Sequence, residues 1–172
     1  VIVLGLILKI TDLIDILRSI KVIGWTMIIF GIFLYLADHF SLSEKINLNY
    51  SIKDAFIMGL WQSAALIPGT SRSGATITAA RILGYERKSA ARIAMLMSIP
   101  TILASGSLEI ANVWHKADFS HFNDAIVVIS LSFIFAFLTL TIMMRLLNSI
   151  SFTPYVIYRI LLGVLLLAIA YN

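Results

Sequence analysis

The sequence predicts an all-α integral membrane protein that contains a re-entrant helical hairpin. Two observations carry this prediction. The chain of 172 residues is 60% hydrophobic and only 13% charged, with a mean hydropathy of +0.97, which lies outside the usual make-up of soluble domains. In addition, a stretch rich in serine, threonine and glycine, with one arginine, interrupts the apolar sequence at residues 65–77. Polar backbone at membrane depth is tolerated only where it lines a cavity.

The N-terminal part begins with an apolar stretch, residues 1–8, that runs into a charged segment. We interpret it as the second half of a span in a shortened chain, because no basic region precedes it as a signal peptide requires. Residues 22–37 are apolar and are expected to cross the membrane with their ends at the interfaces. The polar residues 38–54 predict an exposed loop, at whose end Ser51 caps a new helix.

Residues 52–84 predict two half-length helices that meet at a polar break. The first is apolar and ends at Pro68 and Gly69 after about three turns, which is too short to cross a bilayer. The second covers residues 73–83, and Gly84 stands in the position of its C-terminal cap. We favour a re-entrant hairpin over one irregular span, because several consecutive residues of the break do not favour a helix.

Three further apolar stretches, residues 93–108, 125–144 and 155–171, are expected to span the membrane. The middle one carries no charge and is long enough to cross a hydrocarbon core of about 30 Å. The last one contains Arg159, for which we favour pairing with an acid or a backbone carbonyl over contact with a ligand. A small excess of basic residues at the hairpin mouth places that side in the cytoplasm, so the hairpin tip opens towards the outer face.

The break predicts an anion site. The N–H groups at the start of a helix and the positive end of its dipole bind anions such as phosphate. Arg72 adds a planar fork of donors, while Gly69 and Gly74 let the backbone approach the ligand. The other polar side chains of the predicted site are Ser71, Ser73 and Thr76, with Thr70 and Gln62 beside them.

Two qualifications follow from the same residues. Ser, Thr and Gly also serve as packing residues between membrane helices, with Arg72 then extending to an interface, and Gln62 fits such packing equally well. No Asp or Glu occurs between Asp54 and Glu86, so neither a general base nor a metal-binding carboxylate adjoins the predicted site. We identify no metal ligand in this chain and expect half of a phosphate-processing site.

Composition excludes other classes of function. The chain has no cysteine, which rules out disulfides and thiolate chemistry. Its net charge of +4 is spread along loops, without the basic and aromatic groove that binds nucleic acid. The membrane itself is the expected partner.

The break reads Pro-Gly-Thr-Ser-Arg-Ser-Gly-Ala-Thr at residues 68–76. Further matching segments occur at residues 59–62, 81–84, 90–92, 98–100, 152–155 and 158–159. Together they resemble the undecaprenyl-diphosphate phosphatase (bacitracin-resistance) family of bacterial membranes. The resemblance implies a helical bundle of two inverted repeats, each with a hairpin and three spans. Residues 1–50 would then hold the last two helices of an incomplete first repeat and a connecting loop, and residues 51–172 the second repeat.

The resemblance also implies an activity. Members hydrolyse undecaprenyl diphosphate to undecaprenyl phosphate and inorganic phosphate, which recycles the lipid carrier for peptidoglycan synthesis and gives bacitracin resistance. They are multi-pass proteins of the inner (plasma) membrane. The catalytic residues would be Arg72, Ser71, Ser73 and Thr76, with Gly69, Thr70, Gly74 and Gln62 as phosphate contacts.

The family further implies a divalent cation, Mg or Ca, whose ligands lie mostly in an N-terminal acidic motif that nothing in this chain matches. We therefore expect a polyprenyl diphosphate lipid as substrate but no turnover by the chain alone, and a homo-oligomer is left open. The alternative is a lipid-phosphate or anion transporter, because broken helices and inverted repeats are also typical of secondary transporters. A structural remnant is the third interpretation.

Overall fold

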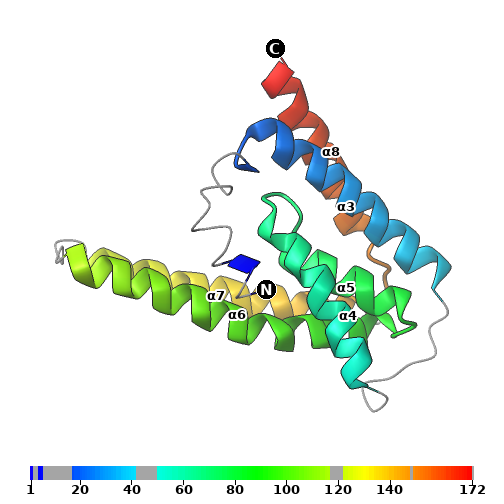
Figure 1. Ribbon diagram of the computed structural model, residues 1–172, viewed down its shortest axis with the longest axis horizontal. Helices are drawn as coiled ribbons and strands as arrows, with labels where there is room; N and C mark the ends of the chain where they lie inside the picture. The colour runs from blue at the N-terminus through cyan, green and yellow to red at the C-terminus, as the bar shows by residue number, and fades with distance from the viewer. Residues whose placement is uncertain (2–3, 6–16, 42–49, 117–121, 148, 172) are drawn as a thin grey trace.

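The computed structural model describes every residue except 2–3, 6–16, 42–49, 117–121, 148 and 172, and all regular elements of the described part are helical (Figure 1). The elements are α3 (Ile20–Phe40), α4 (Ile52–Ser63), the short 3₁₀ helix η2 (Ala64–Leu66), α5 (Arg72–Ile82), α6 (Arg87–Lys116), α7 (Phe122–Leu146) and α8 (Thr153–Tyr171).

Four described helices are long and apolar enough to cross a membrane: Ile20–Phe40, Arg87–Leu108, Ala125–Leu146 and Thr153–Tyr171. They coincide with the four predicted spans, so an all-α membrane protein is confirmed. The apolar start of the chain lies mostly outside the described residues. The division into an incomplete and a complete repeat therefore stays a prediction.

The hairpin between the first two spans forms as the sequence predicts. α4 packs against α5, and η2 with the following turn joins them. Ser51 caps α4 by accepting a hydrogen bond from the N–H of Asp54 at 3.1 Å. At the other end, Gly84 has a φ of +89°, and the N–H of Tyr85 returns to the carbonyl of Ala80. This Schellman motif needs a left-handed residue, which explains the glycine.

α3 and α8 pack along each other at close range (Figure 1). A Cβ added to Gly163 would lie 2.9 Å from the carbonyl oxygen of Gly24. Small residues of this kind let the backbones of two membrane helices approach, where dispersion contacts replace the hydrophobic effect as the source of association.

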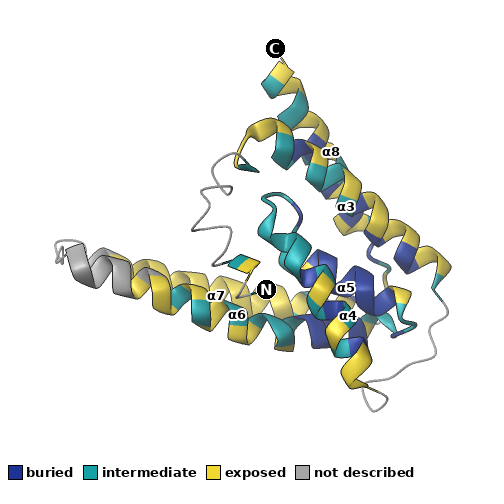
Figure 2. Cartoon of the chain, in the orientation of Figure 1, coloured by how far each residue is buried: buried dark blue, intermediate teal, exposed yellow. Residues whose placement is uncertain are grey.

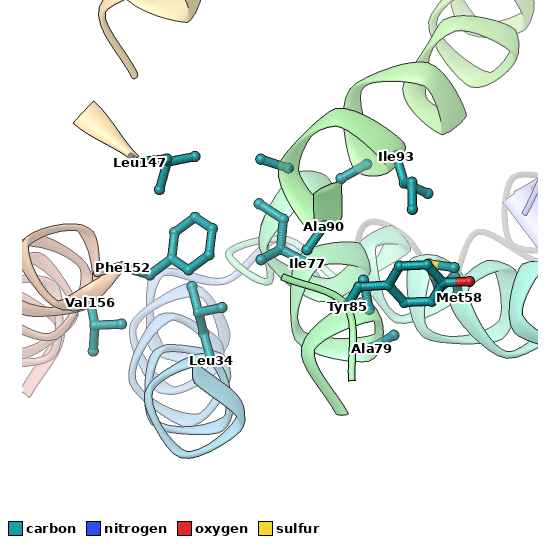
Figure 3. Packing of buried hydrophobic residues seen from close by; sticks show 13 residues of the cluster. Leu34, Met58, Ile77, Ala79, Tyr85, Ala90, Ile93, Leu147, Phe152 and Val156 are labelled. Atoms are coloured by element: carbon teal, nitrogen blue, oxygen red, sulfur yellow. The ribbon is translucent and has the colours of Figure 1, made fainter. Parts of the chain in front are cut away.

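The buried residues gather around α5 and the start of α6, while α7 and the outer faces of the other spans are exposed (Figure 2). Figure 3 shows Leu34 of α3, Ile77 of α5 and Phe152 before α8 gathered in this core. Exposed Leu, Ile and Phe side chains on a membrane helix face lipid. The packing of α5 at the centre is what holds the polar break in place.

The predicted exposed loop over residues 38–54 begins too early. α3 continues to Phe40, and Asp38 is buried, with 5% of its surface exposed. Its carboxylate lies 3.1 Å from Nε of Arg81 and 2.8 Å from Nε of Arg87, and it accepts the N–H of Phe152 at 3.2 Å. A buried charge is tolerated when it is paired in this way, and polar character alone gave no sign of the pairing.

Candidate anion site at the start of α5

The turn between η2 and α5 is seated on α3. Gly69 has a φ of +89°, and a Cβ there would lie 2.2 Å from Oγ1 of Thr26 and 2.6 Å from the carbonyl oxygen of Ile23. The Thr26 hydroxyl donates to the carbonyl of Pro68 at 2.7 Å. Both the backbone conformation and the close approach therefore require glycine at this position.

Ser71 caps α5 in an unusual conformation. It has a φ of +69°, the one positive φ among the described non-glycine residues. Its hydroxyl oxygen accepts the N–H of Gly74 at 3.2 Å and lies 3.0 Å from the hydroxyl of Tyr155 and 3.4 Å from that of Ser73. A strained serine persists only where its surroundings hold it, and such strain concentrates at functional sites.

A pocket of about 460 Å³ opens beside this turn. Arg72 lines it from a half-buried position, and its Nη1 donates to Oγ1 of Thr101 on α6 at 3.3 Å. No carboxylate of the described residues pairs with Arg72. The pocket is lined by Ala65, Ile67, Pro68, Gly69, Ser71, Arg72, Ser73, Ser98 and Ile102.

Of the eight predicted site residues, Gly69, Ser71, Arg72 and Ser73 line the pocket, and the other four do not. Gln62 is buried, and its amide donates to the carbonyl of Met97 at 3.4 Å and to Thr101 at 3.5 Å. It thus shares the Thr101 hydroxyl with Arg72 and supports that side chain from behind.

The three remaining members are also covered. Thr76 is buried, and its hydroxyl donates to the carbonyl of Arg72 at 3.1 Å. Thr70 is fully buried, and Gly74 lies against Ser71 in the first turn of α5. Direct phosphate contact by these residues stays a prediction.

Ser98 of the pocket lining and two further hydroxyl residues were not among the predicted site residues. Thr101 and Tyr155 both direct hydroxyl groups at the turn, from α6 and α8. A signal existed for Tyr155, which lies in a segment that carries the family resemblance, whereas Thr101 lies one residue beyond such a segment. Arg159 was expected to pair with an acid or a carbonyl, and its Nη2 donates to the carbonyls of Gly69 and Thr70 at 2.7 and 2.9 Å.

A second, apolar cavity of about 340 Å³ adjoins the turn. Ser73 lines both spaces, and Tyr155, whose hydroxyl reaches Ser71, lines the apolar one. The remaining lining residues come from α5, α6, α7, the segment before α8 and the first turn of α8: Ile77, Ala91, Met95, Leu140, Met143, Leu146, Leu147, Ile150, Ser151, Phe152 and Pro154. The site therefore offers a cationic pocket and an apolar cavity that meet at one serine.

The described residues hold no group of three His, Asp or Glu side chains that would bind a metal ion. The pocket presents a guanidinium group, hydroxyls and a helix N-terminus. This donor set binds anions and does not coordinate a divalent cation, which prefers carboxylate and carbonyl oxygens.

Comparison with known proteins gives a consistent result. The family model described as "Bacitracin resistance protein BacA" matches residues 1–165. Similar curated proteins carry the name undecaprenyl-diphosphatase. That of Jannaschia sp. (strain CCS1) is 60% identical over 171 residues, which is 99% of this chain and 64% of the relative. That of Roseobacter denitrificans is 55% identical over 172 residues, covering 100% and 64%. That of Pelagibacter ubique is 36% identical over 174 residues, covering 100% and 67%. These matches do not bear out the expectation that the chain is inactive.

Proposed function

Because the chain belongs to the bacitracin resistance protein BacA family, we propose that it releases inorganic phosphate from undecaprenyl diphosphate and leaves undecaprenyl phosphate. The product would return to the carrier pool for peptidoglycan synthesis. The chain spans 64% of the length of the first two relatives, so the activity carried by their name is a proposal for it. The single observation that carries the proposal is the pocket around Arg72 at the start of α5.

In this mechanism the pocket holds the terminal phosphate. The Arg72 guanidinium binds two of its oxygens, and the first N–H groups of α5 face the same charge. Water attacks the terminal phosphorus, the bond to the bridging oxygen breaks, and the leaving group departs as the monophosphate. Fixed donors stabilise the charge that develops on these oxygens, which is worth about 10²- to 10³-fold in rate for one donor of this kind. Ser71 and Ser73 add hydroxyls at the rim.

The proton acceptor and the cation are not supplied by the described pocket. Its donor set does not fit Mg or Ca, so we derive no step through a metal ion. A divalent cation, with ligands outside the described residues, remains part of the proposal through the family resemblance.

The apolar cavity supports an amphiphilic substrate. It begins at Ser73 and continues between α5, α6 and α7, so a prenyl tail can enter it while the diphosphate lies at Arg72. A soluble phosphate ester would have no use for this second space. We place the substrate with its head group in the pocket and the first units of its tail in the cavity.

We further propose the bacterial inner membrane as the location, with the pocket open to the outer face. The support is the distribution of basic residues about the hairpin mouth. A homo-oligomer, which the sequence left open, is checked by light scattering in detergent.

The experiment that tests the function is phosphate release from undecaprenyl diphosphate in detergent with Mg or Ca present. We expect release by the chain, a loss of about 10²-fold or more in Arg72→Ala, and full activity in Arg145→Ala, because Arg145 is exposed at the end of α7. Absence of release by the unmutated chain with either cation would refute the proposal. Uptake of labelled phosphate into vesicles under those conditions would favour the carrier instead.

A further inference from the structure

Arg159 on α8 is a buried cation that uses two of its five N–H donors. Its exposed fraction is 2%, and Nη2 alone donates to the carbonyls of Gly69 and Thr70. Nε and Nη1 are buried without a hydrogen-bond partner among the described residues. Buried N–H groups of this kind are rare and expensive, and they call for a physical reason.

The guanidinium group lies against the first turn of α5. A Cβ added to Gly74 would be 2.8 Å from Nη1 of Arg159, which explains why a residue without a side chain stands there. The aromatic ring of Tyr155 lies 5.8 Å from Cζ of Arg159 and is neutral. Arg159 therefore adds a full positive charge beside the positive end of the α5 dipole, behind the pocket that Arg72 lines.

No carboxylate of the described residues balances this charge. Asp38 is engaged by Arg81 and Arg87, and Asp54 accepts the hydroxyl of Tyr85. A buried cation is tolerated when a counter-charge compensates it. In the described part of the chain the compensating charge is missing, and the anion pocket is lined by Gly69, whose carbonyl accepts a hydrogen bond from Arg159.

The two bonds of Arg159 also set the direction of the turn. Because a trans peptide directs its C=O and N–H to opposite sides, holding the Thr70 carbonyl turns the N–H of Ser71 away from Arg159. No hydrogen bond engages that N–H among the described residues, and Ser71 lines the pocket. The two hydrogen bonds from Arg159 to the carbonyls of Gly69 and Thr70 thus explain how Ser71 keeps its φ of +69°.

We propose that Arg159 is the positioning residue of this anion site and the buried counter-charge for a doubly phosphorylated head group. It fixes the Thr70–Ser71 peptide with its N–H free for a ligand oxygen, and its charge favours a diphosphate over a monophosphate. This inference rests on the proposed function, since both place the substrate head group at Arg72.

The test measures anion binding rather than turnover. The full chain in detergent is titrated with methylenediphosphonate and, separately, with methylphosphonate at constant ionic strength, and binding is followed by the rise in melting temperature. We expect the unmutated chain and Arg145→Met to bind the diphosphonate at least tenfold more tightly than the monophosphonate. In Arg159→Met the ratio should fall to about one, and Arg159→Lys, which keeps the charge, should retain part of it.

The ratio of the two affinities separates a positioning role from general damage to the fold, because a loosened fold lowers the affinity for both ligands equally. If Arg159→Met and Arg159→Lys keep the full preference for the diphosphonate while Arg72→Met loses it, the inference about Arg159 is wrong and the site stands. If the unmutated chain binds neither compound, the anion site fails and the proposed function fails with it. If Arg159→Met does not fold, the Lys variant decides: a partial loss of the preference for the diphosphonate supports the inference, and an unchanged preference overturns it.

Discussion

Replacing Gly69 with alanine is the sharpest perturbation of the turn that supports the site. Two costs combine at this position. A left-handed conformation costs an L-residue about 1–2 kcal/mol. The new Cβ would also lie 2.2 Å from Oγ1 of Thr26 and 2.6 Å from the carbonyl oxygen of Ile23, so α3 and the turn must separate. Overpacking of this kind costs roughly 1–3 kcal/mol.

Separation also breaks the bond from Thr26 to the carbonyl of Pro68, worth about 1 kcal/mol. We expect Gly69→Ala to lower the free energy of unfolding by about 3–6 kcal/mol. The measurement is equilibrium unfolding in mixed micelles, followed by tryptophan fluorescence. Gly59→Ala is the matched control, because it lies inside α4 with no atom within 4 Å of the added Cβ, and it should gain up to about 1 kcal/mol. Equal stability of the two variants would refute the seating of the turn on α3.

Three further outcomes are expected. Asp38→Ala leaves Arg81 buried without its carboxylate and should cost about 3–5 kcal/mol in the same unfolding assay, with Asp38→Asn intermediate. Leu140→Trp projects into the apolar cavity and should slow phosphate release from undecaprenyl diphosphate more than from a short prenyl diphosphate, whereas Leu138→Trp on the exposed face should slow neither. Burial, together with the hydrogen bond to the Asp54 carboxylate, raises the pKa of Tyr85 above its ordinary value of 10.0. The contribution of the protonated tyrosine to the free energy of unfolding is therefore fully present below pH 10 and is lost as the pH rises further. Tyr85→Phe should flatten that alkaline decline.

The spans and the hairpin could be predicted because their signals are local. An apolar run, the pair Pro68 and Gly69, and a glycine after the last helical turn each act within a few residues of their place in the chain. The displaced boundaries include the start of α6, at Arg87 rather than residue 93, and the end of α3, where the helix carries buried Asp38 into a segment whose polarity predicted a loop. Its two arginine partners are far away in the sequence.

The contacts that organise the site could not be predicted for the same reason. Arg72 meets Thr101 across 29 positions of sequence, and Ser71 meets Tyr155 across 84. Such contacts depend on how the helices pack, and neither sequence segment alone predicts its partner. Residue type predicted which side chains suit an anion, but only the helix packing shows that Gln62 contacts α6 at Met97 and Thr101.

The shared border at Ser73 bears on how a long lipid is recognised. A cavity of about 340 Å³ would hold only a small part of an undecaprenyl chain, so under the proposed function most of the tail would remain among the bilayer lipids while the head group is bound. Substrate selectivity would therefore depend on the diphosphate and the first prenyl units, and the total length of the prenyl tail would have little effect on affinity. The substrate would then arrive by lateral diffusion within the leaflet, and its supply would be governed by its surface density rather than by its concentration in water.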